Sequence, residues 1–392
     1  MAVERSNMSE VLKKHAKKVE GGVGFIDSIL EEVKGLSTGN LAIDYILGVG
    51  GVPRGRSVEL YGKPSSGKST AALQVAAQLQ QDIIQSGREE YILYLDFEHA
   101  LDKIYTKNLG FDTEHDSVIL AQPGTLEDGA QLAKDAIDTG LVKLLIWDSV
   151  AEAQPKAIAE GDIDQYFIGT RAKLMSQFLQ QINAKLYRNN CTALFLNHIQ
   201  DKIPMGSYSR PGAATTTTPG GDALKFYSSV RIEFQQQKQI KSKRFNALTN
   251  VEEDFPVGAD VQVKVTKNKV SDPNRSCVVR VRYGKGFDNF FTAIQLLVQH
   301  KRVPSSAGFY YFDKQVAHLA HQDMEISSSG RPNVRGEDNL LQFADSHPEW
   351  RAGVIKEAES VLHSARPTED TISAKPEGLL GIGSIEDLGS DE

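Results

Sequence analysis

A glycine-rich run with the pattern G-x-x-x-x-G-K-[ST] carries the strongest chemical signal in the sequence. It consists of Gly62, Lys63, Pro64, Ser65, Ser66, Gly67, Lys68 and Ser69, followed by Thr70. In this pattern backbone N–H groups converge on phosphate oxygens, the lysine supplies a positive charge, and the serine hydroxyl can ligate Mg²⁺. The run lies between the apolar segment 57–61 and a helix-like segment, which is the context that a phosphate-binding loop requires. We therefore predict a nucleoside triphosphatase site that uses Mg²⁺.

Two acids at the ends of other apolar runs are candidates for the rest of this chemistry. Asp148 closes the apolar run 144–147, where a second metal-holding acid is expected, although it could also cap the following helix. Glu98 follows the apolar run 91–95 and is the best-placed general base for an attacking water. Spacing alone leaves open that Glu98 is an ordinary surface charge.

The elements that must position these residues follow an α/β pattern. Apolar runs at 57–61, 91–96, 117–121, 143–148 and 191–197 alternate with helical patterns. Such runs indicate mostly parallel strands that are covered on both faces. Strand-like segments at 230–234, 261–267 and 276–283 are expected to extend the sheet, and helical patterns after residue 288 predict a small α+β C-terminal domain.

Composition and charge exclude several classes of protein. The 392 residues are 40% hydrophobic and 24% charged, which is ordinary for a folded globular protein. No signal peptide or run of about 18 uncharged apolar residues is found, so a cytoplasmic protein is predicted. The two cysteines, Cys191 and Cys277, are expected to be buried and inert. The net charge of −7 is uneven, because 367–392 carries −6 and 225–285 carries +7.

Several further segments resemble the RecA recombinase family, bacterial or phage. They are LSTGNLAIDYILGVGGVPRGRSVELYGKPSSGKST, DFEHALDKIYTKNLG, IWDSVAEAQPKAIAEGDI, GGDALKFYSSVR and VKVTKNK, in that order from about Leu36 to Gly286. The resemblance implies a RecA-type core at 36–287, with an N-terminal helix and polymerisation arm at 1–35, a C-terminal domain at 288–366 and an acidic, disordered tail at 367–392. In the family the arm adds a strand to a neighbouring subunit. The arm could instead pack on its own core, and the tail could either compete with DNA for basic surface or merely solubilise the chain.

The resemblance also assigns roles in an ATP site. Glu98 matches the catalytic base and Asp148 the metal-site acid, while Asp102 and Tyr105 match residues that contact adenine. Tyr283 and Gly284 are similar to the position that closes over the base from the other side. Lys267 and Lys269 resemble a pair that reaches the ATP of the adjacent subunit, in the manner of arginine fingers. Without the resemblance, these two lysines would be read as exposed charges at a strand end.

Two segments resemble the mobile DNA-binding loops of the family, at about 160–169 and 199–222. Their glycines, threonines and basic residues could hold phosphates without reading bases, and two isoleucines could wedge between bases. The expected DNA-binding residues are Ile168, Arg171, Lys173, Ile199, Lys202, Arg210, Gly220, Gly221, Lys225 and Arg231.

The sequence departs from the family pattern at the predicted γ-phosphate sensor. His198 stands where the family usually has glutamine, and we hypothesise that it keeps the sensing role with a dependence on pH, because histidine changes charge near neutrality. A histidine satisfied within the core is the alternative. Gln200, Lys173 and the run Gln235 to Gln237 also replace basic residues or arginine, so DNA affinity is expected to be distributed differently.

The resemblance implies a DNA-dependent ATPase that forms helical filaments on single-stranded DNA and exchanges strands with homologous duplex DNA. Such a protein would act in recombination, DNA repair and the SOS response. Its candidate partners are other copies of itself, single-stranded and double-stranded DNA, a single-strand-binding protein and loading factors. Two alternatives stay open: a recombination mediator that uses ATP as an assembly switch, and a ring-forming helicase on the same core. A related ATPase with an N-terminal zinc ribbon is excluded, because neither cysteine lies near the N-terminus.

Overall fold

A computed structural model describes residues 14–15, 32–161, 169–201, 216–246, 250–313 and 319–364. The acidic tail and most of the predicted N-terminal arm and of both DNA-binding loops lie outside these residues, as do Ile168, Lys202 and Arg210. Within the described chain, no helix is both long and apolar enough to cross a membrane.

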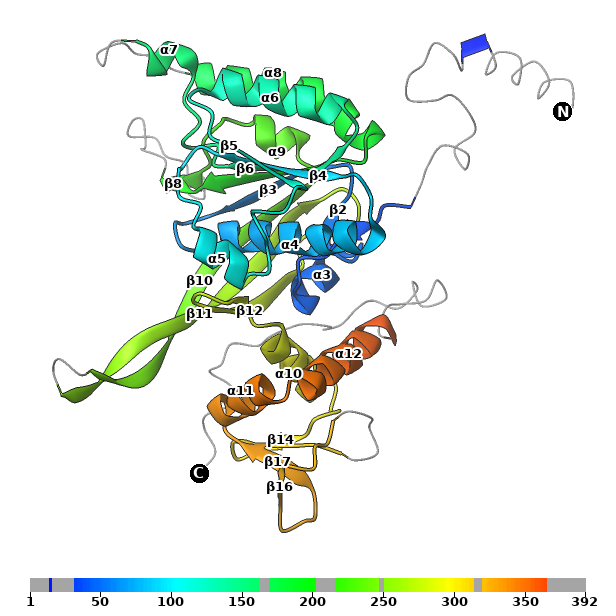
Figure 1. Ribbon diagram of the computed structural model, residues 1–392, viewed down its shortest axis with the longest axis vertical. Coiled ribbons are helices and arrows are strands. Elements are labelled where there is room, and N and C mark those ends of the chain that lie inside the picture. Colours follow the sequence, from blue (N-terminus) through cyan, green and yellow to red (C-terminus); the bar gives the residue numbers. More distant parts are fainter. Residues whose placement is uncertain are drawn as a thin grey trace, which may run out of the picture.

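A nine-stranded sheet forms the centre of the molecule, in the order β13-β12-β11-β10-β3-β7-β6-β4-β5 (Figure 1). The strands from β10 to β5 are parallel, and β11, β12 and β13 add antiparallel pairs at one edge. This confirms the predicted α/β class and the mostly parallel sheet. The strands are β3 (Ser57–Gly62), β4 (Tyr91–Asp96), β5 (Val118–Ala121), β6 (Val142–Asp148), β7 (Thr192–His198), β10 (Val230–Asn246), β11 (Val251–Asn268), β12 (Ser276–Arg282) and β13 (Gly286–Phe287).

Helices cover both faces of this sheet, which explains why its strands are almost continuously apolar. Successive side chains of a strand point to opposite faces. Thus Leu144 and Ile146 of β6 join one core with α4 (Lys68–Ser86), while Leu145 and Trp147 join a second core with α6 (Leu126–Asp138) and α8 (Thr170–Arg188). Both cysteines are buried in these cores, as predicted.

The remaining core elements are short and lie around the sheet. The helices are α3 (Leu41–Leu47), α5 (Lys103–Asn108), α7 (Lys156–Ala159) and α9 (Ala223–Tyr227), and the strands are β1 (Gly35–Leu36), β2 (Val52–Pro53), β8 (Gln200–Asp201) and β9 (Thr216–Thr217). Strands β10 and β11 continue beyond the sheet as a twisted hairpin that projects from the body of the molecule (Figure 1).

The chain after β13 builds a separate hydrophobic core, which lies below the central sheet in Figure 1. Phe290, Phe312 and Phe343 surround Trp350, with ring centroids 5.2 to 5.5 Å from the indole. The helices of this part are α10 (Asn289–Gln299), α11 (Glu337–Ser346) and α12 (Pro348–Ser364), and its four-stranded sheet contains β14 (Ser305–Ser306), β15 (Phe309–Tyr311), β16 (Glu325–Ile326) and β17 (Pro332–Arg335).

Candidate functional site

The glycine-rich run forms a tight turn between β3 and α4. Gly62 ends β3 beside β10, where an added Cβ would lie only 2.2 Å from the carbonyl oxygen of Phe234. Gly67 precedes the first helical residue with a left-handed φ of 95°, a conformation that glycine adopts without strain. No side chain caps the N-terminus of α4, so the N–H groups of its first turn are available to an anion.

Lys68 and Ser66 place an ammonium group and a hydroxyl group in this turn. Lys68 is buried, and its Nζ donates to the carbonyl oxygens of Gly62 at 3.2 Å and Lys63 at 2.9 Å. Burial lowers the pKa of Lys68, although the charges of Asp148 and Glu98 oppose this effect. Ser66 Oγ is buried without a hydrogen-bond partner among the described residues. A bound phosphate would supply acceptors to both side chains, so the turn fits a nucleotide.

Asp148 and Ser69 offer two oxygen ligands at one point of the site. Asp148 ends β6, its Oδ2 accepts a 2.6 Å hydrogen bond from the Tyr94 hydroxyl, and it is also hydrogen-bonded to Ser69. Burial raises the pKa of Asp148 to about 6, with Glu98 and Asp96 adding to the effect. Carboxylate and hydroxyl oxygens are ligands that Mg²⁺ accepts, so these residues fit the metal of a magnesium nucleotide.

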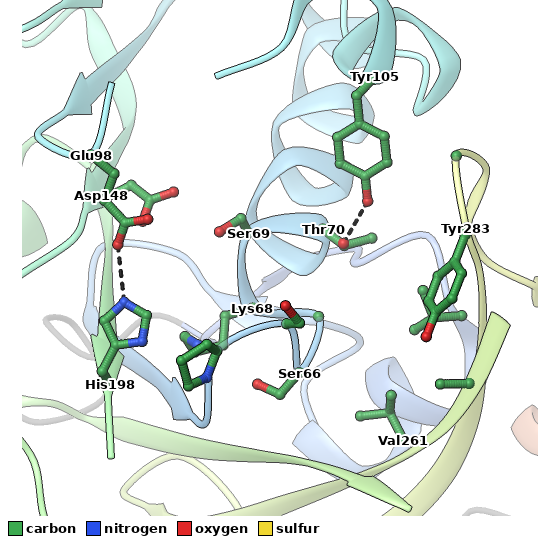
Figure 2. Close-up of a pocket in the computed structure, with 16 residues that line it drawn as sticks. Ser66, Lys68, Ser69, Thr70, Glu98, Tyr105, Asp148, His198, Val261 and Tyr283 are labelled. Carbon is green, nitrogen blue, oxygen red and sulfur yellow. Dashed lines mark hydrogen bonds and ion pairs between the residues drawn. The ribbon is translucent and has the colours of Figure 1, made fainter. Parts of the chain in front are cut away.

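Glu98 and His198 face each other beside this carboxylate. Glu98 follows the end of β4, His198 ends β7, and His198 Nε2 lies 3.0 Å from Glu98 Oε1 (Figure 2). This hydrogen bond is the main cause of the lowered pKa of Glu98, with a further contribution from Ser149. Glu98 is therefore an ionised acceptor that could take a proton. His198 Nδ1 is buried and has no hydrogen-bond partner among the described residues.

Two tyrosines flank the opposite end of the same cavity, which has a volume of about 610 Å³. Tyr105 donates to or accepts from Thr70 at 2.6 Å, and Tyr283 lies across the space from it (Figure 2). Flat aromatic rings on two sides suit a planar base. The complete lining is Pro64, Ser65, Ser66, Gly67, Lys68, Ser69, Thr70, Glu98, Tyr105, Asp148, His198, Ala259, Val261, Val281, Tyr283 and Gly284.

The structure also shows what sequence reasoning missed or placed elsewhere. Ala259, Val261 and Val281 form an apolar wall from β11 and β12 that the sequence analysis did not select. Because these residues alternate with polar neighbours along their strands, the pattern predicts that they face the protein interior. It does not predict which cavity they line. Asp102 does not line the cavity; it caps α5 by accepting a 2.6 Å hydrogen bond from the Tyr105 N–H.

Arg231 differs from its expected role as a phosphate contact. Its Nε donates to Oε2 of the fully buried Glu59 at 2.5 Å, and its guanidinium lies 4.5 Å from the centre of the Tyr61 ring. The Arg231 side chain is only 14% exposed, and its guanidinium neutralises the buried carboxylate of Glu59. In this structure, Arg231 therefore serves as the partner of a buried acid.

The other predicted DNA contacts fall at the edges of the undescribed loops. Arg171 and Lys173 lie in the first turn of α8, and Arg171 Nε is buried without a partner within the described chain. Gly220 and Gly221 precede α9, which carries Lys225 in an ion pair with Asp222. Ile199 follows β7, and its N–H donates to the Gly62 carbonyl at 3.2 Å.

Lys267 and Lys269 lie at the end of β11, away from the cavity of their own chain. Lys267 Nζ donates to the carbonyl oxygens of Lys225 and Phe226, and Lys269 Nζ to that of Phe226 at 3.3 Å. Burial and the neighbouring charges of Lys269 and Arg231 lower the pKa of Lys267.

Comparison with known proteins reveals one family. The RecA N-terminal domain family matches residues 6–288. "Protein RecA" of Staphylococcus carnosus is 36% identical over 328 residues, covering 84% of this chain and 81% of its own. The protein of the same name from Acinetobacter baylyi is 33% identical over 355 residues, covering 91% and 89%. That of Lactiplantibacillus plantarum is 35% identical over 366 residues, covering 91% and 86%.

The raised pKa of Asp148 predicts a pH-dependent effect on stability in the absence of nucleotide. Between about pH 4 and pH 6 the unfolded chain loses this proton first, so stability falls as pH rises through that window. Asp148→Asn should therefore raise the free energy of unfolding at pH 8 by about 1 to 3 kcal/mol. Little gain is expected at pH 4.5. Denaturant unfolding at both pH values measures this difference.

The exposed acid Asp116 provides the matched control. Asp116→Asn should change stability little at either pH. An Asp148→Asn gain of equal size at pH 4.5 and pH 8 would contradict the assignment of a buried, costly carboxylate.

Proposed function

The chain belongs to the RecA family, whose members act in homologous recombination and DNA repair, and from this premise we propose how its residues perform an ATP-dependent recombinase function. The proposal is that the chain assembles as a helical filament on single-stranded DNA, pairs that DNA with homologous duplex, exchanges strands, and hydrolyses ATP with Mg²⁺. The observation that carries it is the convergence of the phosphate-binding turn, three ionisable groups and two tyrosines on one cavity. The ring-helicase and mediator alternatives are not favoured by the RecA relatives.

In the proposed site, each group acts where charge changes during hydrolysis. The first turn of α4 and Lys68 would hold phosphate oxygens, Ser69 and Asp148 would hold Mg²⁺, and Tyr105 and Tyr283 would hold the base. When bound, the metal would supply positive charge that neutralises the phosphates. Glu98, whose pKa is lowered by the hydrogen bond to His198, would orient the attacking water and accept its proton.

Lys267 and Lys269 would complete the site of the adjacent subunit. Support comes from their position, because both lie outside their own cavity and beside the C-terminal end of α9. Cations at that position stabilise negative charge on a transferring phosphoryl group when a neighbouring chain brings its ATP against them. Hydrolysis would then require assembly.

A short chain of hydrogen bonds offers a route between the second DNA-binding loop and the catalytic base. Asn197 Nδ2 donates to the Pro219 carbonyl at 2.9 Å and to Glu59 Oε1 at 3.0 Å. Asn197 Oδ1 accepts from the His198 N–H at 3.0 Å, and His198 contacts Glu98. Movement of the loop end at Pro219 on DNA would therefore reach Glu98 through two adjacent residues of β7. DNA itself is proposed to contact Arg171, Lys173, Ile199, Gly220, Gly221 and Lys225, together with Ile168, Lys202 and Arg210.

Shared sites predict recovery of activity when two inactive variants are mixed. Glu98→Gln should lower the DNA-stimulated ATPase rate by about 10²- to 10⁴-fold, because the general base is lost. The double variant Lys267→Ala/Lys269→Ala should be similarly slow. In an equal mixture, roughly a quarter of the interfaces pair an intact Glu98 with intact lysines if subunits assort at random in a head-to-tail filament. ATPase assays of the mixture should therefore recover roughly a quarter of the wild-type rate.

A mixture no faster than the sum of its components would contradict action of the lysines in trans. Lys264→Ala, on the same strand and outside the cavity, is the control and should hydrolyse ATP at nearly the wild-type rate.

The hydrogen bond from His198 predicts a change in the pH profile of ATP hydrolysis. His198→Ala removes the main cause of the lowered pKa of Glu98, so that pKa should rise. Because the base must be ionised, the acid limb of the kcat profile should move to higher pH. His99→Asn is a suitable control, since His99 is exposed and has a left-handed φ of 53° that asparagine tolerates. An acid limb in His198→Ala identical to that of wild type would exclude this positioning role.

A further inference from the structure

The C-terminal core carries a cluster of metal-binding side chains that has no part in the nucleotide chemistry. His321 and Asp323 precede β16, and His347 follows α11 and directly precedes α12. One ligand atom from each residue lies within 4.8 Å of the others. His321 and Asp323 are near neighbours in the sequence, whereas His347 lies 24 residues beyond Asp323, so the fold of the C-terminal core brings His347 to the other two.

The distances in this cluster approach those around a tetrahedral metal ion. His347 Nε2 lies 3.2 Å from Asp323 Oδ2, and His321 Nδ1 lies 3.6 Å from the same oxygen. Ligand atoms at about 2.0 to 2.1 Å from Zn²⁺ are about 3.3 Å apart in a tetrahedron. Two of the three edges already have nearly this length. The third edge, between His321 Nδ1 and His347 Nε2, would shorten to this length through small side-chain rotations. His321 Nδ1 now accepts a 3.2 Å hydrogen bond from the Asp323 N–H and would give it up to bind the metal.

His347 is held in the orientation that a metal ligand requires. Its Nδ1 lies 2.8 Å from the Phe343 carbonyl oxygen, which can only accept a hydrogen bond, so Nδ1 carries the proton. Nε2 faces Asp323 Oδ2 at 3.2 Å, a contact in which Nε2 must donate a proton, and a bound metal ion would take the place of that proton. This backbone partner is the kind that orients metal-binding histidines.

Packing further restricts the His347 ring. It stacks on Phe343 with centroids 4.1 Å apart and planes inclined by 23°, and Phe343 in turn packs against the buried Trp350. The two histidine side chains are each 24% exposed, while that of Asp323 is 58% exposed. Packing therefore holds the His347 ring in place, and the exposed Asp323 leaves the cluster open to an ion from solvent.

We propose that His321, Asp323 and His347 form a zinc-binding site that fastens the segment before β16 to the junction of α11 and α12. Two imidazoles and one carboxylate suit Zn²⁺, whereas Mg²⁺ and Ca²⁺ prefer oxygen ligands alone. The fourth position would be taken by water. The neighbouring Met324 is anchored in the C-terminal core, and the metal would tie a second point of the same segment to the helices.

Zinc titration of the full chain, in competition with a chromogenic chelator and in buffer containing Mg²⁺, tests this site. Wild type should bind one Zn²⁺ per chain in a saturable manner. Asp323→Asn and His347→Gln should weaken that binding by more than the roughly 10- to 100-fold that loss of an outer-shell partner costs. Asp323→Asn keeps the shape of an exposed side chain, so its loss of binding cannot be ascribed to unfolding.

Two control variants separate this site from other histidines. His300→Gln, at the end of α10, and His198→Ala, in the nucleotide cavity, should both retain the stoichiometric zinc. Zinc should also raise the thermal midpoint of wild type by roughly 5 °C or more, an increase that Mg²⁺ at the same concentration and Asp323→Asn should not show. Absence of a stoichiometric site in wild type, its loss in His198→Ala, or unchanged zinc binding in Asp323→Asn would each overturn the proposal.

Discussion

The arrangement of this molecule depends on the burial of parallel strands whose carboxyl ends meet at one edge of a sheet. Strands β3, β7, β6 and β4 are adjacent and parallel, so the residues at or just beyond their ends converge. Gly62, His198, Asp148 and Glu98 occupy these positions. Helices on both faces supply the apolar burial that holds the strands, and α4 adds an uncapped N-terminus at the same edge. The site is therefore a consequence of the layer architecture.

Placing charges at this edge has an electrostatic cost that the proposed ligand would offset. Lys68 has a lowered pKa and Asp148 a raised one, in both cases chiefly because of burial. Phosphate oxygens would favour the charged form of Lys68, and Mg²⁺ that of Asp148. Glu98 is different, because His198 already favours its ionised form. Bound phosphate and Mg²⁺ would thus offset the cost of burying the charges of Lys68 and Asp148. The ionised form of Glu98, in contrast, is favoured by a group of the protein itself.

The fold class and the phosphate-binding turn could be predicted from sequence because both depend on local patterns. Strands buried on both faces are continuously apolar, and the glycine-rich run has few alternative uses. Contacts between distant residues could not be predicted in this way. Arg231 resembled any basic residue near a DNA-binding loop, but its partner Glu59 lies 172 residues away in the chain, on the neighbouring strand. The apolar wall of Ala259, Val261 and Val281 and the cluster at His347 likewise exist only after β11, β12 and the C-terminal helices have packed.

The central claim is that this cavity powers homologous strand exchange. Its most direct test is the reaction of circular single-stranded DNA with homologous linear duplex, in the presence of ATP and Mg²⁺. Wild type should form joint molecules and then exchanged products, and should form none with heterologous duplex, without ATP, or with Lys68→Ala in place of wild type. If wild type binds single-stranded DNA and hydrolyses ATP but yields no homology-dependent joint molecules, the recombinase account is contradicted.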